Sequence, residues 1–155
     1  QDRKRSNEKV GQRDHCRMRI IPQIIAALKA DADVTTALTN TRVYADYAPQ
    51  DIDKPFILLS VPNTSAFGMV NNCSSRAYSA RLTVDVICDT RAQTEDVIEA
   101  IENCLDGYSS SDSTHPIGGV SVQSGIGWEV LAPLDGSDER AFVCTQDYLV
   151  DYVRT

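Results

Sequence analysis

The sequence has 155 residues, of which 42% are hydrophobic and 24% are charged, and its formal net charge is −7. This length and composition are typical of one globular domain that buries a core without metals or disulfides. No hydrophobic run approaches the roughly 20 residues that cross a bilayer, and the polar N-terminal segment lacks the apolar stretch of a signal peptide. We therefore expect no membrane partner.

Positive charge is concentrated in the first seventeen residues, which carry six basic and three acidic groups. The rest of the chain carries 9 basic and 19 acidic groups, a net charge of −10. A surface of that charge repels DNA phosphates, which argues against a groove that grips nucleic acid. Residues 1–19 show no hydrophobic periodicity, so we interpret them as a basic N-terminal arm, flexible or bound to a partner. Residues 20–155 are then the single folded domain.

The cysteines indicate a reducing place of synthesis. There are five of them, and none has C-x-x-C spacing. Cys88, Cys104 and Cys144 fall at apolar positions, where a free cysteine behaves as a small hydrophobic side chain. We therefore expect free thiols rather than a disulfide framework.

The first part of the chain predicts helices followed by a buried strand. An amphipathic helix is predicted over 22–30, where a proline suits the first turn and an apolar stripe follows the helical period. A short helical turn is predicted at 34–38 and a brief strand at 42–44. The apolar run 56–61 predicts a buried strand, which Pro62 is expected to end.

Residues 63–76 are rich in Ser, Asn and Gly and lack any period, which predicts a long loop. Apolar side chains on such a loop suit a surface that orders when a partner binds. The candidate partner contacts are Phe67, Met69, Val70 and Asn71. The alternative is that Phe67 and Val70 simply cover the end of the core.

The second part of the chain predicts strands on either side of a capped helix. Strict alternation over 78–88 is the pattern of a half-buried antiparallel strand. A T-x-x-Q capping box then predicts a helix, which Gly107 ends in the left-handed conformation. Strands are predicted at 120–128 and 140–153, the latter with only Gln146 out of its apolar pattern. The elements predict an α+β fold: one antiparallel or mixed sheet of about four to five strands with two main helices on one face.

The chain shows no catalytic motif. His15 lies in the arm and His115 in a Ser/Gly-rich loop, where a solvated side chain is the ordinary role and a zinc ligand is rare. The serines at 109–113 have no G-x-S-x-G frame. We therefore expect a protein that is not an enzyme and that holds no metal and no cofactor.

Carboxylates offer the strongest enzymatic alternative. Asp85 and Asp89 follow each other on one strand, and Asp147 and Asp151 do so on another. If those strands are neighbours, four carboxylates could hold Mg²⁺, as in a nuclease. Such an enzyme also needs charge that attracts phosphate, and Arg81 alone supplies it. The ordinary interpretation is an acidic, solvated face.

Three segments of the chain resemble one known family: IIPQIIAALKADADVTTAL, RVYADYAPQDIDKPFILLSV and RLTVDVICDTRAQTEDVIEAIENCLDG. They are similar to the siphophage tail terminators, or tail completion proteins, minor tail proteins of phages and prophages at the head–tail junction. The resemblance covers about residues 20–107 and, more weakly, the final strand. Its motifs belong to the scaffold. The arm at 1–17 has no counterpart, and the 63–76 loop lacks the family's usual run of glycine with acidic residues.

The resemblance implies a structural protein of the bacteriophage virion. Such proteins form a hexameric ring that caps the finished tail tube, ends its polymerisation and joins the tail to the head. The implied partners are other copies of the chain, the tail tube protein and the head–tail connector or stopper protein. Double-stranded DNA would pass through without specific binding. The implied location is the virion tail at the head–tail junction, after synthesis in the host cytoplasm. A head–tail connector or stopper of the neck is the alternative.

If the protein forms such a ring, the positions of the acidic face and of the last strand can be predicted. Asp85, Asp147 and Asp151 would face the lumen or a neighbouring subunit, and lumen carboxylates would repel DNA phosphates. The long 140–153 strand is expected to offer an edge that pairs with the next copy.

Overall fold

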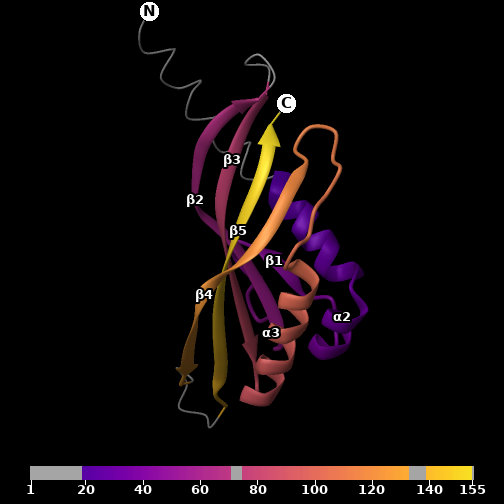
Figure 1. Ribbon diagram of the computed structural model, residues 1–155. Coiled ribbons are helices and arrows are strands. Elements are labelled where there is room, and N and C mark those ends of the chain that lie inside the picture. The colour runs from indigo at the N-terminus through magenta and orange to yellow at the C-terminus, as the bar shows by residue number, and fades with distance from the viewer. Residues whose placement is uncertain (1–18, 71–74, 133–138, 155) are drawn as a thin grey trace, which may run out of the picture.

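The computed structural model describes residues 19–70, 75–132 and 139–154. These residues form one five-stranded sheet in the order β1-β2-β3-β5-β4, with helices packed against it (Figure 1). β1 is parallel to β2, and the other neighbouring strands are antiparallel. The α+β class with a mixed sheet is therefore confirmed. The strands are Val43–Ala45 (β1), Phe56–Val70 (β2), Ser75–Cys88 (β3), Ile117–Leu131 (β4) and Ala141–Arg154 (β5).

The helices begin and end where the sequence pattern places them, within a few residues. The described part of the first helix covers 19–30 and buries Ile24 and Leu28. The predicted arm lies outside the described residues except for Arg19, which is helical. The second helix, α2 (Ala32–Leu38), is capped by Asp31, whose carboxylate accepts the N–H groups of residues 33 and 34 at 3.0 Å.

The helix α3 (Arg91–Leu105) follows the capping box. The Thr90 hydroxyl accepts the backbone N–H of Gln93 at 3.3 Å, which satisfies one N–H of the first turn. Past the other end, Gly107 has φ +76°, a left-handed conformation that costs a glycine little. Both predicted ends of this helix are confirmed.

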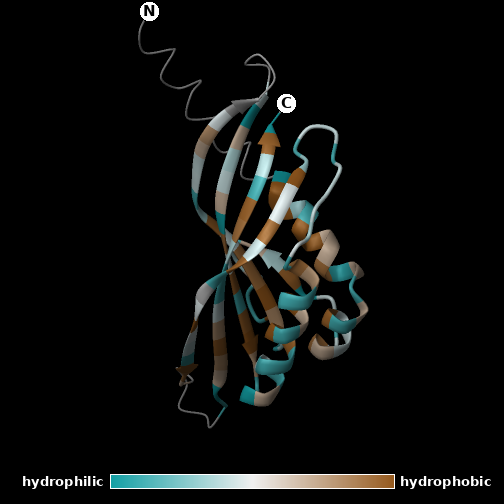
Figure 2. Cartoon of the chain, viewed as in Figure 1, coloured by the Kyte–Doolittle hydropathy of each residue, from teal (hydrophilic) through white to brown (hydrophobic). Residues whose placement is uncertain are grey.

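The core lies between the helices and one face of the sheet. Alternate residues of β3 and β5 are buried, and hydrophobic and hydrophilic residues alternate along the strands in Figure 2. Cys88 and Cys144 are buried and Cys104 is half-buried, as expected, and all three are free thiols. Gln146 is also buried on the apolar face, where its Nε2 donates to the Gln123 carbonyl at 2.8 Å. This bond satisfies the amide nitrogen, while the buried Oε1 has no hydrogen-bond partner.

The predicted loop at 63–76 is wrong. β2 does not end at Pro62 but continues to Val70 and pairs with β3 in a long hairpin, with 71–74 outside the described residues. Two register shifts interrupt the pairing, one between Ser60 and Asn63 and one between Ala66 and Gly68. A proline is tolerated in a sheet at an edge strand or a bulge, and Pro62 lies at the first shift.

The expected edge at 140–153 is also wrong. β5 lies inside the sheet, with β3 on one side and β4 on the other. Strand β4, predicted only at 120–128, covers Ile117–Leu131 and forms the edge. At the opposite edge, β1 covers just three residues beside β2.

Truncating the buried side chain of Leu82 should destabilise the fold far more than the same change on the other sheet face. Leu82 is fully buried, whereas Leu149, on the neighbouring strand, is half-buried on the opposite face. We expect Leu82→Ala to lower the free energy of unfolding by about 2–5 kcal/mol and Leu149→Ala by less than about 1.5 kcal/mol. Urea denaturation of both variants measures this. Equal losses would contradict the assignment of the two faces.

Candidate assembly surfaces

The uncovered face of the sheet carries the predicted acidic residues. Asp85 is opposite Thr145 in the β3–β5 register, and Asp147 is opposite Thr83. The Thr145 hydroxyl donates to Asp85 Oδ1 at 2.5 Å, and the Thr83 hydroxyl donates to Asp147 Oδ1 at 2.7 Å. The threonine and aspartate pairs therefore alternate diagonally across the two central strands. Asp151 lies farther along β5, exposed and opposite Ser79.

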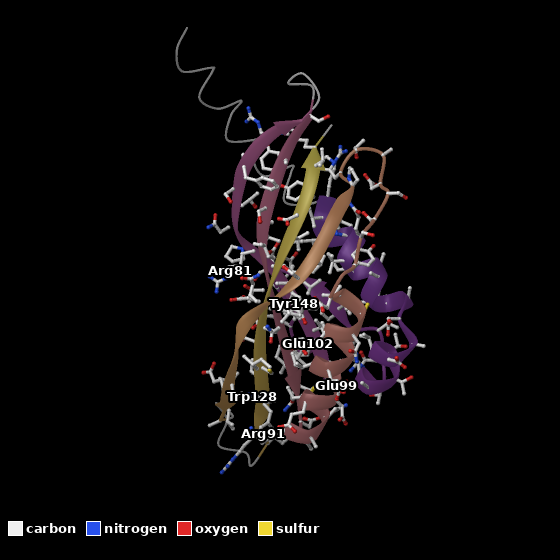
Figure 3. All side chains as sticks on the ribbon, in the orientation of Figure 1. Arg81, Arg91, Glu99, Glu102, Trp128 and Tyr148 are labelled. Atoms are coloured by element: carbon white, nitrogen blue, oxygen red, sulfur yellow. The ribbon has the colours of Figure 1, made fainter. Side chains whose placement is uncertain are left out.

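Arg81 joins this acidic face. Its guanidinium forms an ion pair with Asp147, to which Nε donates at 3.0 Å. Partial burial raises the pKa of Asp147, but hydrogen bonds from Arg81 and Thr83 and the charge of Arg81 outweigh it, so the net pKa lies below the ordinary value. Asp147 is therefore ionised at neutral pH. In Figure 3, Arg81 lies on the side of the sheet away from Glu99 and Glu102 of α3.

The four carboxylates of the nuclease alternative do not converge. Asp85 and Asp147 each accept bonds from protein donors, and Asp89 pairs with Lys54 Nζ at 3.0 Å at the end of β3. Among residues 19–70, 75–132 and 139–154, no three His, Cys, Asp or Glu side chains gather as a metal site would require. Nothing in this arrangement favours Mg²⁺-dependent cleavage.

The predicted partner contacts lie near the end of the β2–β3 hairpin. Phe67 lies at the second register shift with 64% of its surface exposed. The backbones of Met69 and Val70 pair with Arg76 and Ser75, so these residues belong to a strand and not to a loop. Asn71 lies outside the described residues. Figure 1 shows this hairpin extending beyond the helices at one end of the molecule.

A second exposed apolar surface lies on β4 and was missed by the sequence analysis. Ile126, Trp128, Val130 and Leu131 are all exposed although they belong to a strand. The Arg91 guanidinium lies 4.7 Å from the centre of the Trp128 ring, a cation–π contact that links β4 to the start of α3 (Figure 3). The alternation I-x-W-x-V was the available signal, but it is equally typical of a buried strand.

His115 is not the solvated loop histidine that the sequence predicted. It is buried, and its ring lies 6.4 Å from that of Tyr152. Burial lowers its pKa, and the positive charges of Arg19 and Arg154 lower it further, while Asp112 opposes them.

The described helices include none long and apolar enough to span a membrane.

A comparison with models of protein families identifies the family of this chain. The model of the family described as tail completion protein gp17 matches residues 22–125, about two thirds of the chain. The chain belongs to this tail completion family. The resemblance drawn from the sequence is thus confirmed, and the protein is a structural component of a phage tail. No curated protein matches.

A solved structure shares the fold of this tail completion protein. It is a chain of "Virion of native gene transfer agent (GTA) particle", with a TM-score of 0.55 and 18% identity. The match covers 83% of this chain and 91% of that chain, so the two have nearly the same extent. At this identity the likeness shows the fold alone.

The tail completion protein should lose stability as the pH falls through the ordinary pKa of histidine, about 6.5. His115 is held neutral in the fold because its pKa is lowered, whereas the unfolded chain takes up a proton. Its contribution is fully present above that pH and is lost toward the folded pKa. We expect His115→Gln to flatten the dependence of the unfolding free energy on pH between 7.5 and 5, measured by urea denaturation. An unchanged slope would contradict the burial argument.

Proposed function

We propose that this tail completion protein caps the tail tube, ends its polymerisation and joins the tail to the head connector, as a closed ring of six copies at the head–tail junction. The observation that carries this proposal is the family match over residues 22–125. The sheet also has two different edge strands, β1 and β4. Two different surfaces suit a head-to-tail contact, which closes into a ring at a fixed rotation.

In this proposal the two main helices lie on one face of the sheet and point away from the lumen. The opposite face, with Asp85, Asp147 and Asp151, lines the DNA passage. Carboxylates there repel phosphates over about a Debye length, ~8 Å at physiological salt. The face is a passive wall and not a catalytic centre, because Asp85 and Asp147 already accept hydrogen bonds from threonines.

The end of the β2–β3 hairpin contacts the tail tube or the connector in this proposal. The exposed Phe67 supports this role, together with Met69, Val70 and Asn71 next to it in the chain. A two-stranded projection extends the reach of a subunit without altering its core. It therefore suits a contact with a different protein.

Shortening the hairpin should separate folding from tail completion. We expect a variant in which Asn-Gly replaces 67–77 to fold, because the turn joins the paired residues Ala66 and Tyr78. In a phage that lacks the native gene, the native protein should restore tails of normal length that carry heads, and the shortened variant should not, by electron microscopy. The exposed-site variant Lys29→Ala is the control. If the native protein restores head joining but leaves tail length uncontrolled, it is a connector or stopper.

Reversing one charge on the proposed lumen face should slow DNA ejection. We expect Asp151→Lys to slow it at low salt, because the added lysines attract phosphates, and the effect should shrink as salt rises. Glu99→Lys makes the same charge change on the exposed side of α3 and should leave ejection unchanged (Figure 3). Fluorescence of released DNA measures the rate in assembled virions. Equal rates for both variants would place the acidic face away from the DNA.

A further inference from the structure

The exposed large hydrophobic residues gather at the two edges of the sheet. Among the described residues there are six, and Phe67 is the one near the hairpin end. Tyr47, 78% exposed, lies two residues after the end of β1 at one edge. The other four belong to β4 at the opposite edge: Ile126, Trp128, Val130 and Leu131. We call these four the β4 strip. A monomer that leaves apolar edge strands uncovered risks aggregation, so both edges need a cover.

The strand register places these two surfaces at the same level of the sheet. Residues that are paired from strand to strand form a row across the sheet. The row that begins at Ala45 in β1 ends at Ile126 in β4. The row that begins at Val43 ends at Trp128 in the same way. Copies related by rotation about an axis along the strands would therefore bring the β4 strip of one beside β1 of the next, without a shift along the axis. The first row consists of Ala45, Leu59, Val84, Gln146 and Ile126.

The strand directions also suit this contact. β1 is parallel to β2, and three antiparallel pairings separate β2 from β4, so β1 and β4 run in opposite directions. In a ring of equally oriented copies, β4 would meet the neighbouring β1 as an antiparallel partner. Edge strands pair in this way through their unpaired N–H and C=O groups. In β1 the Val43 N–H and the Ala45 C=O are already bonded within the chain, to Thr41 and Tyr47, so the contact relies on side-chain packing as well as on the other backbone groups.

The β4 strip is longer than the edge that it faces. It spans 126–131, roughly 20 Å at ~3.4 Å per residue, whereas β1 has three residues. The whole of β1 can therefore lie against the strip. The Arg91–Trp128 contact holds the widest side chain of the strip before association, which lowers the ordering cost.

We propose that the β4 strip of one copy packs against the β1 edge and Tyr47 of a second copy, so that the sheets of neighbouring subunits continue into each other. The inference rests on the proposed ring and names the contact that closes it. The two surfaces differ, so the contact is head-to-tail and each copy uses both of its edges. The hairpin end, with Phe67, stays available for a different protein.

Cysteine cross-linking of the full chain tests the contact. We expect the double variant Tyr47→Cys with Val130→Cys, treated with a short bis-maleimide at about 100 µM, to give a ladder of covalent oligomers. An equal mixture of the two single variants should give covalent dimers only, because each copy then offers one reactive edge. Each single variant alone should match the parent chain, whose own cysteines set the background.

Three outcomes overturn the inference. Cross-linking of Val130→Cys with itself would mean a two-fold contact between β4 strands. A ring seen by native mass spectrometry without the Tyr47–Val130 cross-link would place the subunit contact elsewhere and leave the proposed ring standing. A strict monomer at that concentration, without cross-links, would show that the proposed contact does not form. Conversely, a cross-linked ring that fails to complete tails would overturn the proposed function alone.

A charge at the strip provides an independent measurement. We expect Val130→Asp to raise the dissociation constant of the assembly at least about tenfold, because an unpaired carboxylate would be buried at the contact. Ala26→Asp places the same charge at an exposed position of the first helix and should change it less than about twofold. Sedimentation velocity measures both, and equal effects would overturn the proposal.

Discussion

β3 and β5 pair without interruption from Arg76 opposite Arg154 to Cys88 opposite Phe142, and the rest of the molecule is arranged around this ladder. One of its faces is buried beneath the helices, and the other carries Asp85, Asp147 and Asp151. Because side chains alternate with a period of two, a slip of one residue would exchange the two faces. The buried face therefore fixes the register, and the register in turn fixes where the carboxylates meet their threonine partners.

Local signals predicted the elements that depend on local physics. The T-x-x-Q box fixes the start of α3 because the Thr90 hydroxyl satisfies an N–H group only three residues away. Alternation predicted β3 because one of its faces is dry and the other is wet. The same alternation placed Asp85, Asp147 and Asp151 on one face of the sheet, because side chains on a strand point alternately to its two faces. The scaffold motifs of the first 107 residues sufficed to place the chain in its family.

Features that depend on distant pairing could not be read in this way. Pro62 and the polar residues after it have the composition of a loop, but β3 supplies hydrogen-bond partners, and two register shifts absorb the misfit. The position of β5 inside the sheet depends on β4 returning beside it, which no local pattern encodes. The exposure of Trp128 escaped notice for the same reason, because an alternating strand does not reveal which neighbour is missing. His115 was misjudged because the residues that bury it lie far away in sequence.

The charge of the body and its apolar edges act over different distances. Residues 18–155 carry a net charge of −10, so two copies repel each other at long range, within the limits set by salt. The hydrophobic attraction of the β4 strip acts only at contact. Such a balance keeps free copies apart at low concentration. A template that holds the copies side by side would raise their effective concentration and so favour association despite the charge repulsion. In the proposed ring, this balance would favour assembly at the end of a tail tube over assembly of free copies at low concentration, while concentrated free copies could still associate.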